Sequence, residues 1–251
     1  MTTTTEHIDR KSLYTSLEAR IDYLHRFLDF NDSDVAALAF GSKFVKDIIP
    51  AVVHIVYRKL LQFDITARAF EIRDTRSEEP LQTILEDGSP ELQRRKTFLN
   101  SYLHKICSDQ SQLAFWQWLD QVGAMHVGLR RKNPLHVEYI HISATLCLIQ
   151  SVLVEGILSH HGFPMSKRIA MVKAINKVIW IQNDLFAKWY VRDGEEFSEE
   201  AAESAATTVE KLNSSSQPNL KQHAPSTAAP ACPFTGMAKA MKELSVGEGA
   251  H

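Results

Sequence analysis

Apolar side chains recur at spacings of three and four along the chain up to about Val191, which is the period of amphipathic helices. The first stripe of this kind contains Leu13, Leu17, Ile21, Leu24, Phe27 and Leu28. Few runs alternate between apolar and polar residues with a period of two, and no Asn-Gly or Asp-Gly turn joins such runs. The pattern therefore predicts an all-α domain of seven or eight helices.

Capping signals divide this domain into helices. The cluster at residues 31–34, Asn-Asp-Ser-Asp, is typical of a helix start and predicts a helix that runs to about Phe63. Ser89 followed by Pro90 predicts another start, because proline suits the first helical position. Residues 71–88 are a polar connection. The remaining helices are expected at about 65–70 (a short turn), 89–106, 109–126, 136–160 and 164–191.

Residues 192–251 differ in composition from the rest of the chain. They are rich in Ala, Ser, Thr, Glu and Pro, with nine acidic and five basic residues, and only Phe197 and Phe234 are aromatic. Such a segment cannot bury enough apolar surface to offset its ordering entropy. We therefore expect a folded domain over residues 1–191 and a disordered polar tail over 192–251. The Cys232-Pro233 pair in the tail occurs in haem-regulatory motifs, but an incidental dipeptide is the simpler interpretation.

Charge and composition narrow the choice of partners. The formal net charge is −2 and the isoelectric point is near 6.6, which argues against a general attraction to nucleic acid or an anionic membrane. The longest apolar region, residues 142–158, contains Gln150 and Glu155 and is too short to span a bilayer. The first residues lack the apolar stretch of a secretory signal, and three scattered cysteines form no disulfide framework. We expect a cytoplasmic protein without membrane or nucleic-acid partners.

One of the eleven histidines is a candidate metal ligand. His126 ends the apolar segment AFWQWLDQVGAMH, where it shares one broad helix face with Val122 and Met125. An imidazole in such a place can bind iron through one ring nitrogen while the other nitrogen bonds to a backbone carbonyl. A histidine that merely packs in the core is the commoner case, and Gly123 fits either a close-packed helix or a planar ligand. His136 and His141 are five residues apart, which does not suit a metal pair on one helix.

The opposite wall of a pocket around His126 would come from two other helices. Val56, Tyr57 and Leu60 form an apolar stripe in AVVHIVYRKLL, and Phe98 with Tyr102 forms one in RRKTFLNSYL. Stripes of this kind are usually core. Tyr57 stands apart because a buried phenol needs a hydrogen-bond partner, which bound dioxygen can supply in a haem pocket.

The order of helices, the entry segment RIDYLHRFLDFNDSDVAAL and the stretch WLDQVGAMHVGLRRKNPLHVEYIHI resemble protoglobins and the globin domains of globin-coupled sensors. The resemblance covers about residues 9–191 and is closest to single-domain forms. It implies a globin fold with an extra N-terminal helix, haem b as cofactor, and reversible binding of O2, CO or NO in a sensor or a scavenger. Globin-coupled sensors continue into a signalling domain, whereas here only the polar tail follows Val191.

The resemblance also assigns roles by position. His126 matches the proximal histidine that binds the iron, Tyr57 the distal tyrosine, and Phe98 the distal-helix phenylalanine. Val56 stands where many protoglobins carry a bulky aromatic residue, so we expect a more open distal pocket. Leu60, Val122 and Met125 complete the predicted haem contacts. The basic loop at 130–132 is interpreted as solvated, with contact to the haem propionates as the alternative.

Protoglobins dimerise through their last two helices, and the resemblance implies a homodimer here. Those helices carry more apolar residues than one core face needs, which favours a partner face. The residues that we expect at this partner face are Ile149, Leu153, Ile157, Ile175, Ile179, Ile181, Leu185 and Trp189.

Two other functions stay open: a globin-shaped interaction module that has lost haem, and a haem enzyme such as an NO dioxygenase. The predicted pocket lacks an acid–base pair, so we assign no catalytic residue.

Overall fold

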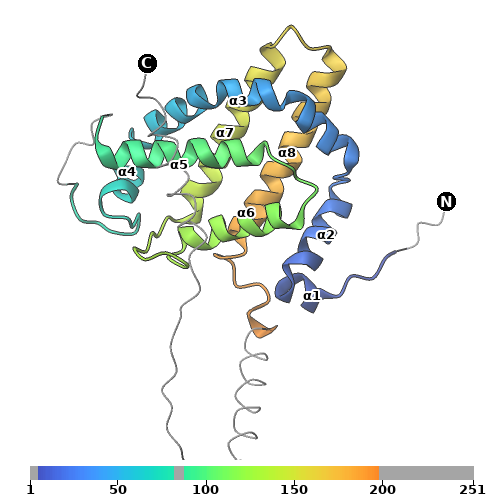
Figure 1. Cartoon of the computed structure of the whole chain (residues 1–251). Helices are drawn as coiled ribbons and strands as arrows, with labels where there is room; N and C mark the ends of the chain where they lie inside the picture. Colours follow the sequence, from blue (N-terminus) through green and yellow to red (C-terminus); the bar gives the residue numbers. More distant parts are fainter. Residues whose placement is uncertain (1–4, 82–87, 198–251) are drawn as a thin grey trace, which may run out of the picture. The chain divides into compact units, whose positions relative to one another are not determined.

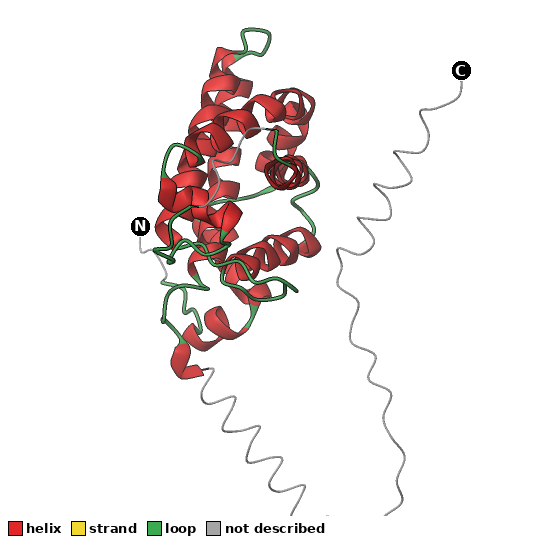
Figure 2. Cartoon of the chain, turned by 90° about the vertical axis from the view of Figure 1, so that its left-hand side faces the viewer, coloured by secondary structure: helices red, strands yellow, loops and turns green. Residues whose placement is uncertain are grey.

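The computed structural model describes residues 5–81 and 88–197, and over these ranges it confirms the all-α prediction (Figures 1 and 2). Within them β-structure is limited to two isolated bridges, which both involve His136. The helices are α1 (Arg10–Thr15), α2 (Leu17–Phe27), α3 (Asp32–Leu60), α4 (Asp64–Glu71), α5 (Pro90–Ile106), α6 (Leu113–His126), α7 (Tyr139–Ser159) and α8 (Met165–Ala187).

The starts of α3 and α5 follow from local capping, as predicted. The side chain of Asn31 accepts a hydrogen bond from the backbone of Ser33, and the Asp34 side chain accepts one from the backbone N–H of Asn31. Ser89 caps α5 by accepting from the N–H of Leu92 at 3.4 Å. These bonds satisfy backbone donors that a helix start leaves without an intrahelical partner.

Three predicted boundaries differ from the structure for identifiable reasons. The N-terminal stripe splits into α1 and α2 at Ser16, whose hydroxyl caps α2. α6 begins at Leu113 rather than at about 109, because Asp109 accepts hydrogen bonds from Ser111 and holds a turn there. α7 begins at Tyr139 rather than at about 136. His136 is held in extended backbone, where its N–H donates to the carbonyl of Arg73 and its own carbonyl accepts from Thr75.

α8 is the central helix of the core, since it packs against α3, α6 and α7. α3 also lies against α5 and α7, and Figure 1 shows α3 and α5 running side by side across α7 and α8. Ion pairs link α2 and the start of α3 to α8. Arg20 on α2 binds Asp184 through two nitrogens at 2.6 and 2.8 Å, and Lys177 binds Asp34 at the start of α3 at 2.8 Å. The core therefore forms where α3, α6 and α7 meet α8.

The residues that we counted toward a partner face on α7 and α8 lie mostly in the core, so that interpretation is wrong. Seven of the eight are buried, and only Trp189 is partly exposed; the buried ones are Ile149, Leu153, Ile157, Ile175, Ile179, Ile181 and Leu185. Both helices have neighbours on more than one side, and this burial on several faces accounts for their high apolar content.

The segment after α8 packs back on α1. The ring of Phe197 lies 6.2 Å from that of Tyr14, and the guanidinium of Arg10 forms an ion pair with Glu196. Gly194 adopts a positive φ of 86° beside the Tyr14 ring, so a side chain at this position would be strained. Residues 192–197 thus contact the helical domain, although we placed them in the tail. The rest of the predicted tail, including Cys232 and Pro233, lies outside the described residues.

α7 is, among the described helices, the one whose length and composition would allow it to cross a membrane, with 21 residues and a mean hydropathy of 1.7. A single such helix is weak evidence, because core helices pass the same test. The side chains that α7 buries against its neighbours include Ile142, Leu146 and Leu153.

Candidate functional site

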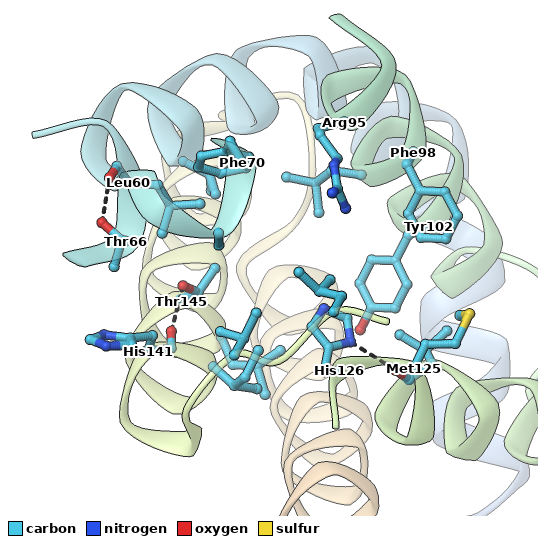
Figure 3. A pocket seen from close by; sticks show the side chains of 18 of the residues that line it. Leu60, Thr66, Phe70, Arg95, Phe98, Tyr102, Met125, His126, His141 and Thr145 are labelled. Atoms are coloured by element: carbon cyan, nitrogen blue, oxygen red, sulfur yellow. Dashed lines mark hydrogen bonds between the residues drawn. The ribbon is translucent and has the colours of Figure 1, made fainter. Parts of the chain in front are cut away.

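A deep cavity opens between α3, α5, α6 and α7, with further walls from α4, α8 and the loop after α6 (Figure 3). It holds about 1040 Å³ of empty space, part of which is open to solvent. Most of its lining is aliphatic or aromatic, and a few arginine, histidine, tyrosine and threonine side chains interrupt it. A mainly apolar cavity with few converging polar groups is the usual form of a cofactor site.

All seven residues predicted to contact a cofactor line this one cavity. Val56, Tyr57 and Leu60 reach it from α3, Phe98 from α5, and Val122, Met125 and His126 from α6. Val56, Tyr57, Val122 and Met125 are buried, whereas 36% of the Phe98 surface is exposed. Three segments far apart in the sequence therefore converge on the same space.

His126 is positioned by its own helix. Its Nδ1 lies 2.8 Å from the carbonyl oxygen of Val122, one turn earlier on α6. A carbonyl oxygen can only accept, so Nδ1 carries the proton and Nε2 keeps its lone pair. The ring of Phe186 packs edge-on against the imidazole with the ring centres 5.2 Å apart. Burial lowers the pKa of His126 from 6.5 to about 4, and so the ring is neutral at pH 7.

Two tyrosines bring phenol groups to the cavity. Tyr57 packs on Phe70 with ring centres 5.4 Å apart, and its hydroxyl makes no hydrogen bond with another described residue. Tyr102 stacks on Trp118, and its hydroxyl is buried without a partner in the described part of the chain. Burial raises the pKa of both phenols well above 10, so both stay protonated and can donate a hydrogen bond.

Two half-buried arginines also line the cavity. Arg95 extends from α5 into it, as Figure 3 shows, and Arg131 comes from the loop after α6. Neither guanidinium has an ion pair or hydrogen bond with another residue that the structure describes. Burial and the neighbouring cations Arg95 and Arg73 lower the pKa of Arg131 to about 10. Arg130 and Lys132 flank Arg131 in this loop and are exposed. The prediction of a solvated loop therefore applies to these two residues and not to Arg131.

The other sequence candidates serve packing. Gly123 faces α8: a Cβ there would lie 2.5 Å from the carbonyl oxygen of Leu185 and 2.9 Å from the Trp189 ring. The His136 ring covers Gly128, which has a φ of 86°. His141 does line the cavity, where its Nε2 is buried 3.7 Å from a Glu138 oxygen.

Some cavity residues were not predicted from the sequence. Arg95, Phe98 and Tyr102 follow one another at spacings of three and four, so the helical period could have placed Arg95 on the apolar face. Phe186 had no such signal, because its contact with His126 joins residues far apart in the chain.

The comparisons with known proteins agree with this architecture. Among solved structures, the globin domain of a globin-coupled sensor from Geobacter sulfurreducens matches with a TM-score of 0.55 at 15% identity, over 68% of this chain and 97% of that one. The globin domain of DosC from Escherichia coli, in a ferrous form, matches with a TM-score of 0.46 at 12% identity, over 66% of this chain and 95% of that one. No curated protein matches significantly. The protoglobin family model matches residues 17–196, most of the chain, and the protein therefore belongs to the protoglobin family.

Proposed function

We propose that the protein binds one haem b in the cavity, with His126 as the protein ligand of the iron, and that it reversibly binds O2, CO or NO as a sensor or scavenger. Membership of the family implies a haem cofactor. The observation that carries the assignment to this cavity is the bond between Nδ1 of His126 and the Val122 carbonyl, which leaves a neutral Nε2 without a partner among the described residues.

The cavity fits the chemistry of the cofactor. A porphyrin is a broad apolar plate, and side chains such as Val56, Val122, Met125 and Phe186 provide apolar walls for it. A metal ligand has to be deprotonated to bind, and burial already keeps His126 neutral. When bound, the haem supplies the iron that takes up the gas, while the protein supplies the axial ligand, the polarity of the distal side and the access route.

Tyr57 is the distal donor in this proposal. Its phenol is protonated, buried and free of hydrogen bonds to described residues, so it can donate to a polar diatomic ligand. The Val56 side chain beside it is small, which leaves room on that side of the cavity. Phe98 and Leu60 add apolar surface to the lining of the same cavity.

The absorption spectrum of the purified protein tests this function. We expect a Soret band that shifts when CO is added to the ferrous protein, and we expect His126→Gly to lose or strongly shift that band. Added imidazole should restore it in the glycine variant, because the free ligand fills the space of the missing ring. His141→Ala is the matched control, since His141 lines the same cavity but has no predicted bond to the metal. An unchanged Soret band in His126→Gly refutes the assignment.

Two alternative functions each have a decisive outcome of their own. Protein that stays colourless after haem is added is a globin-shaped interaction module. Turnover of NO with a supplied reductant would identify a haem enzyme such as an NO dioxygenase. We propose that the protein binds gas without catalysis and that it is cytoplasmic. The near-neutral net charge of −2 supports the expectation of no nucleic-acid partner.

We also propose that the protein forms a homodimer through α7 and α8. The interface residues in this proposal differ from those expected from the sequence. Before the last residue of α7, its exposed positions recur at spacings of three and four and carry one charge; they are Ile140, Ala144, Cys147, Ser151, Glu155 and Leu158. Ile140 is 68% exposed, and Trp180 on α8 is 59% exposed. A stripe with a single charge on α7, together with the large exposed side chains Ile140 and Trp180, favours a partner face.

Sedimentation velocity measures the oligomeric state directly. Ala144→Arg should convert the dimer to a monomer, because it places a charge in the middle of the exposed α7 stripe. Thr97→Arg, which adds the same charge at an exposed position of α5, should remain dimeric. A wild-type chain that sediments as a monomer at all concentrations contradicts the proposal.

A further inference from the structure

The electrostatic surroundings of Arg95 and Arg131 are unusual for half-buried cations. The charged groups that act on Arg131 are Arg95 and Arg73, and both lower its pKa. Burial and Arg73 lower the pKa of Arg95, and the Tyr57 phenol beside it stays protonated and so brings no balancing negative charge. Among the described residues no carboxylate balances either guanidinium. A buried charge without a counter-ion is costly, so this arrangement suits a ligand that brings negative charge.

Arg73 differs from the other two cations because the protein itself satisfies it. Its guanidinium donates to the carbonyl oxygens of Asn133 at 2.7 Å and Pro134 at 3.1 Å. These bonds fix the loop that carries Arg131 against the segment after α4. The backbone of His136 strengthens the same junction by donating to the Arg73 carbonyl at 2.9 Å. Arg131 is thus held at the cavity wall by a structured loop.

The two arginines come from different walls. Arg95 belongs to α5, together with the predicted distal residue Phe98, and Arg131 lies five residues after His126 on the chain. Both line the cavity that also holds the free Nε2 of His126. Planar guanidinium groups bind carboxylates through two parallel hydrogen bonds, which adds orientation to charge pairing.

We propose that Arg95 and Arg131 form a carboxylate clamp, in which each guanidinium binds one of the two propionate groups of the haem and so fixes its orientation above His126. The inference rests on the proposed haem binding and adds a specificity to it: the cavity selects a porphyrin with free acid groups. Arg95 and Arg131 are positioning residues, since they act on the side groups of the cofactor and not on the bound gas.

The rate of haem loss to excess apomyoglobin tests the clamp in the full-length chain. Each single variant, Arg95→Gln or Arg131→Gln, should lose haem about tenfold faster than the wild type, since a charge-assisted bond contributes on this scale. The double variant should be faster still, and Arg131→Lys should lie between wild type and Arg131→Gln because it keeps the charge without the planar fork. Arg94→Gln and Arg130→Gln are matched controls, because these exposed arginines adjoin Arg95 and Arg131 in sequence.

A second arm uses the wild-type protein and needs no variant to fold. Haem dimethyl ester has the same ring and iron but no carboxylates, so the wild type should lose it faster than haem by about the factor seen in the double variant. A third readout needs no haem at all. Apo protein of the double variant should melt at a higher temperature than the wild-type apo protein, because two unpaired cations are gone.

The outcomes separate the clamp from the function on which it rests. If the wild type binds neither haem nor its ester, both the proposed function and the clamp fail. If the wild type binds haem firmly but loses the ester at the same rate, the clamp is wrong and the haem assignment stands. Equal rates of haem loss in the double variant and in the Arg94 and Arg130 controls also overturn the clamp.

Discussion

The imidazole of His126 donates from Nδ1 to the carbonyl oxygen of Val122, 2.8 Å away and one turn earlier on the same helix. The bond lies within α6, and Phe186 of α8 packs edge-on against the same ring with the ring centres 5.2 Å apart. The local geometry of one helix therefore prepares the Nε2 lone pair before a ligand arrives.

Burial of this imidazole predicts how the apo protein responds to acid. The pKa of His126 is about 4 in the folded chain and 6.5 in the unfolded chain, so between these values the unfolded state binds more protons. Stability of the apo protein should fall as pH falls from 6.5 toward 4, by up to about 3 kcal/mol. Urea denaturation of wild type and His126→Leu over this range isolates the effect, because the leucine variant lacks it. Parallel curves for the two proteins would contradict the assigned pKa.

Gly123→Ala should destabilise the fold by about 2 kcal/mol even though alanine favours helices, because overpacking outweighs propensity. The added methyl group would lie 2.5 Å from the Leu185 carbonyl oxygen, and backbone cannot move aside as a flexible side chain can. Chemical denaturation measures the change. Gly88→Ala is the control, since nothing lies within 4 Å of a Cβ there, and it should be close to neutral.

If Tyr57 donates to the bound gas, Tyr57→Phe should release O2 about tenfold to a hundredfold faster than the wild type. Dissociation of CO should change by less than about threefold, because CO is the weaker hydrogen-bond acceptor. Stopped-flow and flash photolysis measure the two rates. Equal effects on both gases would show that the substitution acts through packing and not through the phenol hydroxyl.

Tyr102→Phe should behave differently from Tyr57→Phe. The Tyr102 hydroxyl is buried without a hydrogen-bond partner in the described structure, so its removal abolishes a desolvation cost and no bond. We expect the apo protein to keep its stability or to gain about 1 kcal/mol. A thermal melt of the apo variant checks this. A clear loss of stability would mean that the hydroxyl has a partner, such as an ordered water.

The parts of the fold that follow from local chemistry could be predicted from the sequence. Asn31 and Ser89 mark helix starts because their side chains cap residues two or three positions away. The start of α7 could not be predicted, because the backbone of His136 bonds to Arg73, which is 63 residues earlier in the chain. A helix boundary that depends on a hydrogen bond between residues far apart in the sequence cannot be seen in the spacing of apolar residues.

The same distinction applies to the site. The seven predicted residues belong to apolar stripes that a helical period reveals, and they do line one cavity. The choice of residues for a partner face on α7 and α8 was wrong, because the number of neighbours around a helix is a property of the whole fold. Seven apolar residues that suggested a partner face instead fill the core around α8.

The close contact at Gly123 couples the position of α6 to that of α8. α6 has no clearance against Leu185 at this position, and three residues earlier Asp120 holds Lys188 at 2.7 Å and the Trp189 indole at 3.2 Å. α6 is therefore held against the end of α8 at two successive positions. We expect a displacement of α6 near His126 to require a matching adjustment around Lys188 and Trp189.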